Sequence, residues 1–231
     1  MNGSFRSRRR KPEPEPIPLD GSATITSLRA CPDDPARVSI RVNRQRVGRI
    51  LIETKAHHQL EVGSVWDEAL DTALRVELDR GNAYRAAIRI LTKRAKSSGE
   101  LQRKLREYHY EPDAIDWCVE RLTELRVLND EEYARMVVRS QLSRKPAGRR
   151  LLSGKLREKG IDSHLIERIL DEMLEDRDTI ADARKLAQQA ARTISDRHDR
   201  EVRKRRITAR LARRGFDFDV IKRVVGELDL G

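Results

Sequence analysis

The segment "LLSGKLREKGI" (residues 151–161) decides the fold, because the chain repeats its pattern twice more. From Leu152 onward the sequence aligns without a gap with "LQRKLREYHYEPDAI", which begins at Leu101, and with "ITARLARRGFDFDVI", which begins at Ile207. Internal similarity of this kind is the signature of a repeat architecture. The sequence therefore predicts one structural unit that is used three times.

Apolar residues recur in all three copies with the spacing of amphipathic helices. They lie four residues apart in the first part of each copy and follow an i, i+3, i+4, i+7 pattern in the second part. The second-part sets are Ile115, Cys118, Val119 and Leu122; Ile166, Ile169, Leu170 and Met173; and Ile221, Val224, Val225 and Leu228. This periodicity predicts two helices that meet across a short connection.

The residues at that connection support a helical hairpin. Gly160 and Gly215 occupy the position of a left-handed helix cap, which glycine adopts without steric cost. His109 takes this position in the first copy, and histidine is enriched among non-glycine residues with positive φ. Pro112 then suits the first residue of the next helix, where a missing N–H costs little.

A further helix is expected before each hairpin, over residues 84–93, 130–143 and 179–194. Two capping boxes mark helix starts, because Ser97 precedes Glu100 and Asn129 precedes Glu132 at the required spacing. The repeating unit is therefore a three-helix module. The expected modules span residues 84–128, 129–175 and 176–231.

The first part of the chain has a different pattern. Residues 1–20 combine a basic cluster with alternating prolines, which predicts a disordered arm. Residues 21–65 are expected to form a β element, in which a hairpin turns at residues 43–46 and a third strand covers residues 23–29. A helix over residues 66–80, within a connecting segment that reaches residue 83, is expected to lead into the modules.

The predicted fold class is mainly α: three tandem three-helix repeats that form an elongated curved array, with a small N-terminal β-hairpin element. Modules that contact mainly their neighbours build a long concave surface. Such a surface suits another polymer better than it suits a small substrate.

Composition restricts the class of protein. Hydrophobic and charged residues each make up 38% of the chain and aromatic residues 4%, which suits thin helical modules. No apolar run approaches the roughly 18 residues of a membrane span, and the arginine-rich start lacks the apolar core of a secretory signal. We therefore expect a cytoplasmic protein with no membrane contact. The two cysteines are too few for a disulfide framework or a zinc site, and Cys118 is expected in the core.

The sequence contains no catalytic or phosphate-loop motif, and its five histidines lack ligand spacing. The densest acidic stretch is "LDEMLEDRD" (residues 170–178), for which a solvated face is favoured over a metal-binding or docking patch. We therefore expect no catalytic residue, no metal and no cofactor, and a protein that is not an enzyme. An enzyme with an unrecognised site is an alternative that nuclease and ATPase assays would test.

The net charge of +11 is concentrated in two segments. Residues 6–11 contribute five positive charges and residues 200–214 contribute a net seven, so the other residues together are nearly neutral. In the second segment an arc of about 100° on one helix carries an arginine face, made of Arg203, Arg206, Arg210, Arg213 and Arg214. This face predicts contact with DNA phosphate or with an acidic protein groove, and a solvated face is the alternative.

Two weaker basic patches lie in the other copies. The second copy contributes Arg149, Arg150, Lys155 and Arg157, and the first contributes Arg103, Lys104 and Arg106. Scarce aromatic residues disfavour base stacking, so any contact with single- or double-stranded DNA is expected to be weak, non-specific and made to phosphates. If all five arginines of the face met phosphates, log K would fall against log salt with a slope of roughly −3.5 to −4.5.

Residues 84–226 resemble the RecX regulators of the RecA recombinase. The resemblance is carried by the threefold repeat and by "SSGELQRKLREYHYEPDAIDWCVERLTEL", "VLNDEEYARMVV" and "LREKGIDSHLIERIL", with "LNDEEYA" (residues 128–134) as the most recognisable stretch. It implies a non-enzymatic modulator that lodges in the groove of the RecA–DNA filament or caps its growing end. It also implies inhibition of strand exchange and of the recombinase's ATP hydrolysis. We expect a monomer.

The alternative is a DNA-binding protein that acts alone, either architectural or transcriptional, because short three-helix units resemble helix-turn-helix modules. No candidate recognition helix shows the grouping of Asn, Gln and Arg at one end that base recognition requires. Affinity for bare duplex, compared with affinity for recombinase-coated DNA, distinguishes the two functions.

Overall fold

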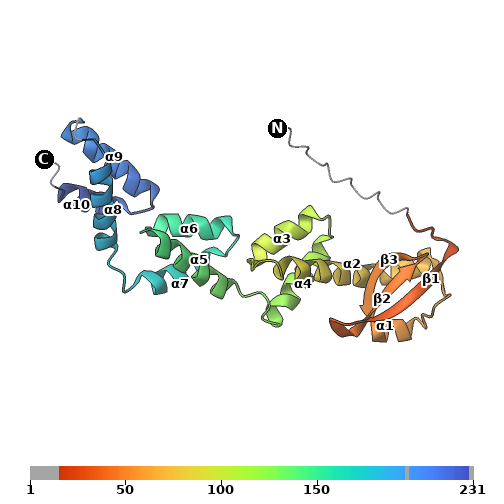
Figure 1. The fold of residues 1–231 in the computed structure, drawn as a ribbon. Helices are drawn as coiled ribbons and strands as arrows, with labels where there is room; N and C mark the ends of the chain where they lie inside the picture. The colour runs from red at the N-terminus through yellow and green to blue at the C-terminus, as the bar shows by residue number, and fades with distance from the viewer. Residues whose placement is uncertain (1–15, 196–197, 229–231) are drawn as a thin grey trace, which may run out of the picture. The chain divides into compact units, whose positions relative to one another are not determined.

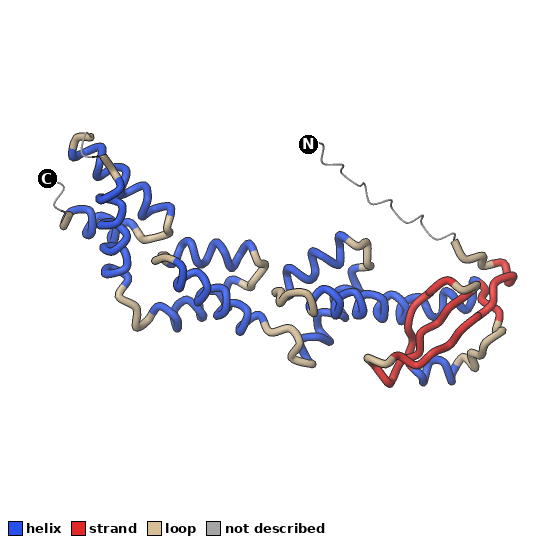
Figure 2. Tube along the Cα trace, viewed as in Figure 1, coloured by secondary structure: helices blue, strands red, loops and turns tan. Residues whose placement is uncertain are grey.

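The computed structural model describes residues 16–195 and 198–228, and in these ranges the chain is mainly helical with an N-terminal sheet (Figures 1 and 2). The strands are β1 (Asp20–Cys31), β2 (Asp34–Val42), β3 (Gln45–Leu51) and β4 (Val65–Asp67). The helices are α1 (Ile52–His57), α2 (Glu68–Leu91), α3 (Ser98–Glu107), α4 (Pro112–Glu124), α5 (Asp130–Arg144), α6 (Arg149–Glu158), α7 (Ser163–Leu174), α8 (Thr179–Thr193), α9 (Arg200–Arg213) and α10 (Phe218–Gly226). The predicted class, mainly α with three three-helix repeats and a small β element, is confirmed.

The chain folds as two compact units. The first contains the residues up to 88 together with residues 110–118, and the second contains residues 89–109 together with those from 119 onward. The basic cluster at residues 6–11 lies outside the described residues. No helix among the described residues has the length and apolar character needed to cross a membrane.

The β element is a four-stranded antiparallel sheet in the order β3-β2-β1-β4. Val42 pairs with Gln45, so two residues, Asn43 and Arg44, connect β2 to β3. Both have positive φ, at 46° and 66°, as a hairpin turn that matches the twist of its strands requires. The predicted hairpin, its turn and the third strand are confirmed, whereas β4 was not predicted.

One face of the sheet is buried against α2. Ile25, Ile40 and Ile50 are fully buried with Trp66 of β4, and Leu74 of α2 packs in the same core. The alternating apolar residues of β2 point into this core, as the period of a strand dictates. The hydrophobic surface of the sheet is therefore covered by the helix that follows it.

Helix α2 corrects one expectation. The sequence predicted separate helices over residues 66–80 and 84–93, but α2 runs unbroken for 24 residues. Gly81, which falls between the two predicted helices, lies inside α2, and a Cβ built on it would come within 2.6 Å of the carbonyl oxygen of Arg49. Glycine is needed here for close packing of α2 on β3 and not for a helix end. The short helix α1 was not predicted either, since its residues fall within the expected β element.

The second and third three-helix modules have separate cores. In the second module α5, α6 and α7 bury one set of residues, namely Tyr133, Ala134, Val138, Ala147, Leu152, Leu156, Ile161, Ile166, Ile169 and Leu170. In the third module α8, α9 and α10 bury another, namely Ala183, Leu186, Ala187, Ala190, Ile207, Leu211, Phe216, Ile221, Val224 and Val225. The apolar positions that aligned between copies are thus the core positions of a repeated unit.

The predicted helix boundaries hold to within a residue at several caps. Gly160 and Gly215 have φ of 73° and 77°, and His109 takes the same conformation at 60°. Ser97 Oγ accepts the N–H of Glu100 at 3.1 Å. Asn129 Oδ1 accepts the N–H of Glu132 at 3.0 Å, and α4 begins at Pro112.

Candidate interaction surface

Helix α9 carries the predicted arginine face. Asp199 caps its start by accepting the N–H of Val202 at 2.9 Å, and Ile207 and Leu211 are fully buried in the core of the third module. Residues that follow the i, i+4, i+7 spacing lie on one side of a helix. Arg206 and Arg213 are exposed two turns apart on α9, and Arg210 lies on the turn between them.

Three of the arginines line a common hollow. Arg206, Arg210 and Arg213 surround a volume of about 240 Å³, to which Ala209 and Ile194 contribute apolar surface. Ile194 follows the last turn of α8, so the hollow forms where α8 and α9 of one module meet. The site therefore combines a small apolar floor with guanidinium groups around it.

Within the described residues, no carboxylate neutralises the charge of this hollow. The Nη1 atom of Arg206 lies 2.8 Å from His198 Nε2, and because a guanidinium only donates, the imidazole nitrogen accepts. Arg210 donates to Thr193 Oγ1 at 3.1 Å. Among the described residues no carboxylate pairs with Arg206, Arg210 or Arg213. The three guanidinium groups are thus available to an anionic partner.

The other two arginines of the predicted face are placed differently. Arg214 donates from Nε to the carbonyl oxygen of Pro146 at 2.8 Å and from Nη2 to that of Lys145 at 2.9 Å. Its guanidinium therefore fastens the third module to the segment between α5 and α6. Arg203 is half-buried on α9 and does not line the hollow.

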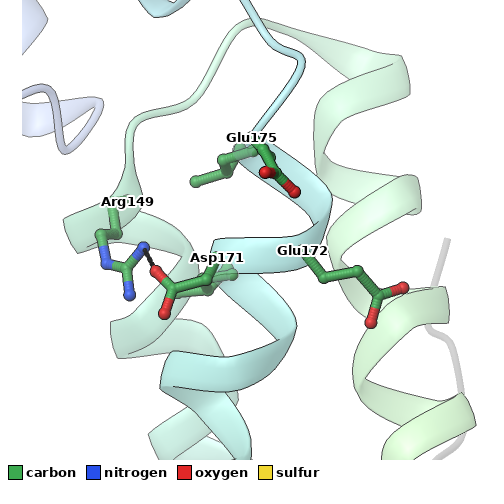
Figure 3. A pocket seen from close by; sticks show the side chains of 6 residues that line it. Arg149, Asp171, Glu172 and Glu175 are labelled. Carbon is green, nitrogen blue, oxygen red and sulfur yellow. Dashed lines mark hydrogen bonds and ion pairs between the residues drawn. The ribbon is translucent and has the colours of Figure 1, made fainter.

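Arg149 of the second module is neutralised by its own chain. It forms ion pairs with Asp171, at 2.7 Å, and with Glu167. Figure 3 shows its guanidinium directed at Asp171, beside a hollow of about 410 Å³ that Glu172 and Glu175 also line. The hydrogen bond with Glu167, assisted by Asp171, raises the pKa of Arg149 above its usual value. The densest acidic stretch of the sequence is thus partly engaged by this arginine.

The remaining predicted basic residues do not form one patch. Arg150 is exposed and lies 3.3 Å from Asp217, while Arg157 is exposed and Lys155 is half-buried. Arg103 donates to the carbonyl oxygen of Glu158 at 2.7 Å, and Lys104 pairs with Glu107 one turn along α3. Arg150, Arg103 and Lys104 therefore bond other groups of the protein, and the predicted basic residues do not form a common surface.

Sequence reasoning missed the junctions between modules. The N–H of Gly148, at the start of α6, donates to the carbonyl oxygen of Arg214 at 2.8 Å, and that of Arg150 donates to the carbonyl oxygen of Gly215 at 3.2 Å. The N–H groups at the start of α6, which have no partner within that helix, thus bond carbonyl groups just beyond the end of α9, the corresponding helix of the next module. The glycine at residue 148 was the available signal.

An equivalent junction joins the segment before α3 to the second module. Ser97 Oγ donates to the carbonyl oxygen of Lys159, and a Cβ on Gly99 would lie 2.7 Å from the carbonyl oxygen of Gly160. Lys159 also forms an ion pair with Glu100, at 2.8 Å. Gly160 therefore serves both as a left-handed cap and as a point of close backbone approach.

The stretch "LNDEEYA" contributes to the same junction. Its Asp130 accepts the N–H of Ser98 at 2.8 Å, and the hydroxyl of Tyr133 donates to Glu100 at 2.7 Å. Burial, together with this hydrogen bond to Glu100, raises the pKa of Tyr133 to about 12. Leu128 and Ala134 are buried and Asn129 caps α5. The most recognisable segment of the chain therefore joins two modules.

In the part of the chain that the structure describes, no group of three or more His, Cys, Asp or Glu residues could hold a metal ion. Both cysteines are buried and free, and burial raises the pKa of Cys118 to about 12. A thiol with so high a pKa is inert, as expected for a core residue.

Family models match each three-helix module in order. The first, second and third three-helix domains of RecX match residues 83–122, 129–170 and 176–225. The regulatory protein RecX of Corynebacterium efficiens is 35% identical over 143 residues, which cover 61% of this chain and 68% of that protein. The regulatory protein RecX of Pelodictyon phaeoclathratiforme is 31% identical and is covered over 82% of its length, with 59% of this chain matched.

Solved structures agree with these matches. A crystal structure of a regulatory protein RecX superposes with a TM-score of 0.67 at 20% identity, covering 89% of this chain and all of the other. RecX from Lactobacillus salivarius superposes with a TM-score of 0.58 at 27% identity, covering 66% of this chain and 98% of the other. With three domain models matched in sequence order and with these relatives, the chain belongs to the RecX family of regulatory proteins.

Proposed function

We propose that this protein binds the RecA–DNA filament, in its groove or at its end, and inhibits the recombinase by lowering ATP hydrolysis and strand exchange. Membership of the RecX family supports the choice of partner. The single observation that carries the proposal on this chain is the hollow of Arg206, Arg210 and Arg213, whose charge no carboxylate among the described residues neutralises.

The chemistry of this hollow suits a charged polymer. Guanidinium groups bind phosphate and carboxylate oxygens in a forked geometry, and both kinds of oxygen line a protein–DNA filament. The second and third modules join in series through the contacts at Gly148 and Gly215, and modules in series suit a repetitive partner. Binding that depends on such contacts is sensitive to salt.

Titration of the protein into RecA on single-stranded DNA tests the proposal. ATP hydrolysis and filament length are expected to fall as the protein is added. The combined variant Arg206→Glu, Arg210→Glu and Arg213→Glu is expected to abolish this inhibition while the helix content in far-UV circular dichroism stays the same. Retained inhibition by the triple variant would remove this hollow from the mechanism.

A matched control uses three exposed arginines away from α9. Arg29, Arg44 and Arg139 are exposed. Changing all three to Glu alters the net charge by the same amount as the test variant. If the control lost inhibition equally, net charge and not the hollow of α9 would account for the effect.

The same arginines would also attract bare DNA through its phosphates. A protein that acts alone on DNA would bind random duplex as tightly as recombinase-coated DNA. Under the proposed function, binding at physiological salt is stronger to the coated form, and anisotropy measurements on labelled DNA distinguish these outcomes.

A further inference from the structure

A groove beside α5 lies outside every site considered so far. It has a volume of about 450 Å³ and is bounded by one side of α5, by the segment after α2 and by Lys159. Its lining includes Arg94, Ala95, Tyr133, Met136, Arg144 and Lys159. All of these residues belong to the second compact unit.

The groove has an apolar floor that the chain leaves exposed. Met136 is 47% exposed although it lies on α5 between the buried residues Tyr133 and Val138. Val137 and Ala95 extend the apolar surface on either side. Methionine is flexible and polarisable, so it adapts to the side chain of a partner, and it is common at binding surfaces.

Basic side chains surround this apolar floor. Lys159 is held by Glu100, whose other carboxylate oxygen accepts the hydroxyl of Tyr133. This network fixes Lys159 and occupies Glu100. Arg144 is exposed and has no carboxylate partner among the described residues, and Arg94 is exposed beside the hydroxyl of Tyr133. Glu100 is thus engaged with Lys159, and no carboxylate of the described residues pairs with Arg144.

This combination selects a protein segment over nucleic acid. Tyr133 is only 6% exposed, so its ring offers no platform on which a base could stack. A phosphate backbone would contact the cations but would leave Met136 and Val137 in water. A peptide with an apolar side chain next to a carboxylate would bury the floor and pair with Arg144 at the same time.

We infer that this groove, here called the α5 groove, docks a segment of the recombinase that presents a Leu, Ile or Phe side chain flanked by Asp or Glu. The inference rests on the proposed function for the identity of the partner. It adds a second contact region, in which an apolar anchor gives affinity and the surrounding cations give orientation.

Two single variants test the α5 groove in the full chain. Arg144→Glu reverses the charge of Arg144, and Met136→Ala removes the exposed apolar side chain from the floor of the groove. Each is expected to weaken binding to the RecA filament by about tenfold, the effect expected of an interface residue that contributes substantially. Affinity is measured by anisotropy, and far-UV circular dichroism monitors folding.

The matched control is Arg139→Glu on the same helix. Arg139 is exposed, and it is absent from the lining of the groove. The control carries the same charge change as Arg144→Glu and is expected to bind like the unaltered chain. The inference would be overturned if Arg139→Glu weakened filament binding as much as Arg144→Glu does. It would also be overturned if neither Arg144→Glu nor Met136→Ala weakened binding.

A photoreactive benzoylphenylalanine at residue 136 identifies the occupant. Crosslinking to a recombinase segment with the stated composition is the expected result, and crosslinking to DNA alone would overturn it. If the unaltered chain fails to bind the filament at all, the proposed function and this inference fall together. If it binds and the groove variants bind equally well, only the inference falls.

Discussion

Gly148 and Gly215 lie in direct backbone contact, since a Cβ built on Gly148 would come within 2.1 Å of the carbonyl oxygen of Gly215. Around this contact the N–H groups of Gly148 and Arg150 donate to the carbonyl oxygens of Arg214 and Gly215, the two residues that follow α9. The junction therefore satisfies polar groups at two helix ends at once, and it requires that no side chain stand between them.

Gly148→Ala is expected to lower the free energy of unfolding by about 2 kcal/mol or more, because the added methyl group would displace the backbone of Gly215. Urea unfolding followed by circular dichroism measures the change. Gly154→Ala is the control, since Gly154 lies inside α6 with nothing within 4 Å of its Cβ position. That change is expected to stabilise the chain by about 0.4–1 kcal/mol. Equal effects at the two glycines would contradict the close contact.

Arg214→Ala is expected to act on stability and not on phosphate contact. Its guanidinium bonds the carbonyl oxygens of Lys145 and Pro146, and hydrogen bonds from charged groups contribute about 1.5–3 kcal/mol. Removing it should lower the free energy of unfolding by an amount in that range. The salt dependence of DNA binding should stay as it is in the unaltered chain.

Arg213→Ala should show the opposite behaviour. Arg213 lines the hollow of α9 and is exposed, so its loss should leave stability nearly unchanged. If it contacts phosphate, the slope of log K against log salt should become shallower by roughly 0.7–0.9. An unchanged slope with unchanged affinity would show that Arg213 does not meet phosphate.

Tyr133→Phe tests the contribution of the "LNDEEYA" stretch to the junction. The pKa of Tyr133 is raised to about 12, so the folded chain holds this proton more tightly than the unfolded chain, whose tyrosine titrates near its ordinary value of about 10. Stability should therefore fall as pH rises from about 10 to about 12. The phenylalanine variant should lack this part of the decline. Urea midpoints at about pH 9 and pH 11, compared between the two proteins, measure it.

The stability of Tyr133→Phe below pH 10 gives a second measure. Loss of the hydroxyl leaves Glu100 paired with Lys159 and removes one hydrogen bond to a charged group. The expected cost is about 1.5–3 kcal/mol. A variant as stable as the unaltered chain, with the same pH dependence, would contradict a role for Tyr133 in the junction.

Features that depend on neighbours in sequence were predictable. The caps at Gly160 and Gly215 and the start of α4 at Pro112 follow from local backbone preferences and are confirmed, and so is a turn within residues 43–46, which occupies Asn43 and Arg44. The repeated core positions were predictable as well, because a helix exposes or buries residues with a fixed period.

Features that depend on distant residues were not predictable. Glycine is a poor helix former, and only the close approach of the Arg49 backbone in β3 explains the place of Gly81 inside α2. The helical spacing placed Arg214 on the arginine face, but acceptors 68 and 69 residues earlier in the chain engage its guanidinium. The same holds for β4, which exists because Trp66 and Val65 pair with β1.

Trp117 of α4 provides a last prediction, in the unit that contains the sheet. The guanidinium carbons of Arg37 and Arg80 each lie 5.7 Å from the centroid of its ring. Arg37 is only 8% exposed, and its Nε lies 3.2 Å from Asp34. Loss of the ring would leave the buried guanidinium of Arg37 without its aromatic partner. This loss destabilises the fold, because water does not take the place of the ring.

Trp117→Leu is therefore expected to lower the free energy of unfolding by about 2 kcal/mol or more, since two cation–π contacts are lost together with buried surface. Trp117→Phe keeps an aromatic face under Arg37 and should cost less than the leucine variant. Urea unfolding of both variants measures the difference. Equal costs would contradict a contribution from the aromatic face, because phenylalanine keeps such a face under Arg37 and leucine does not.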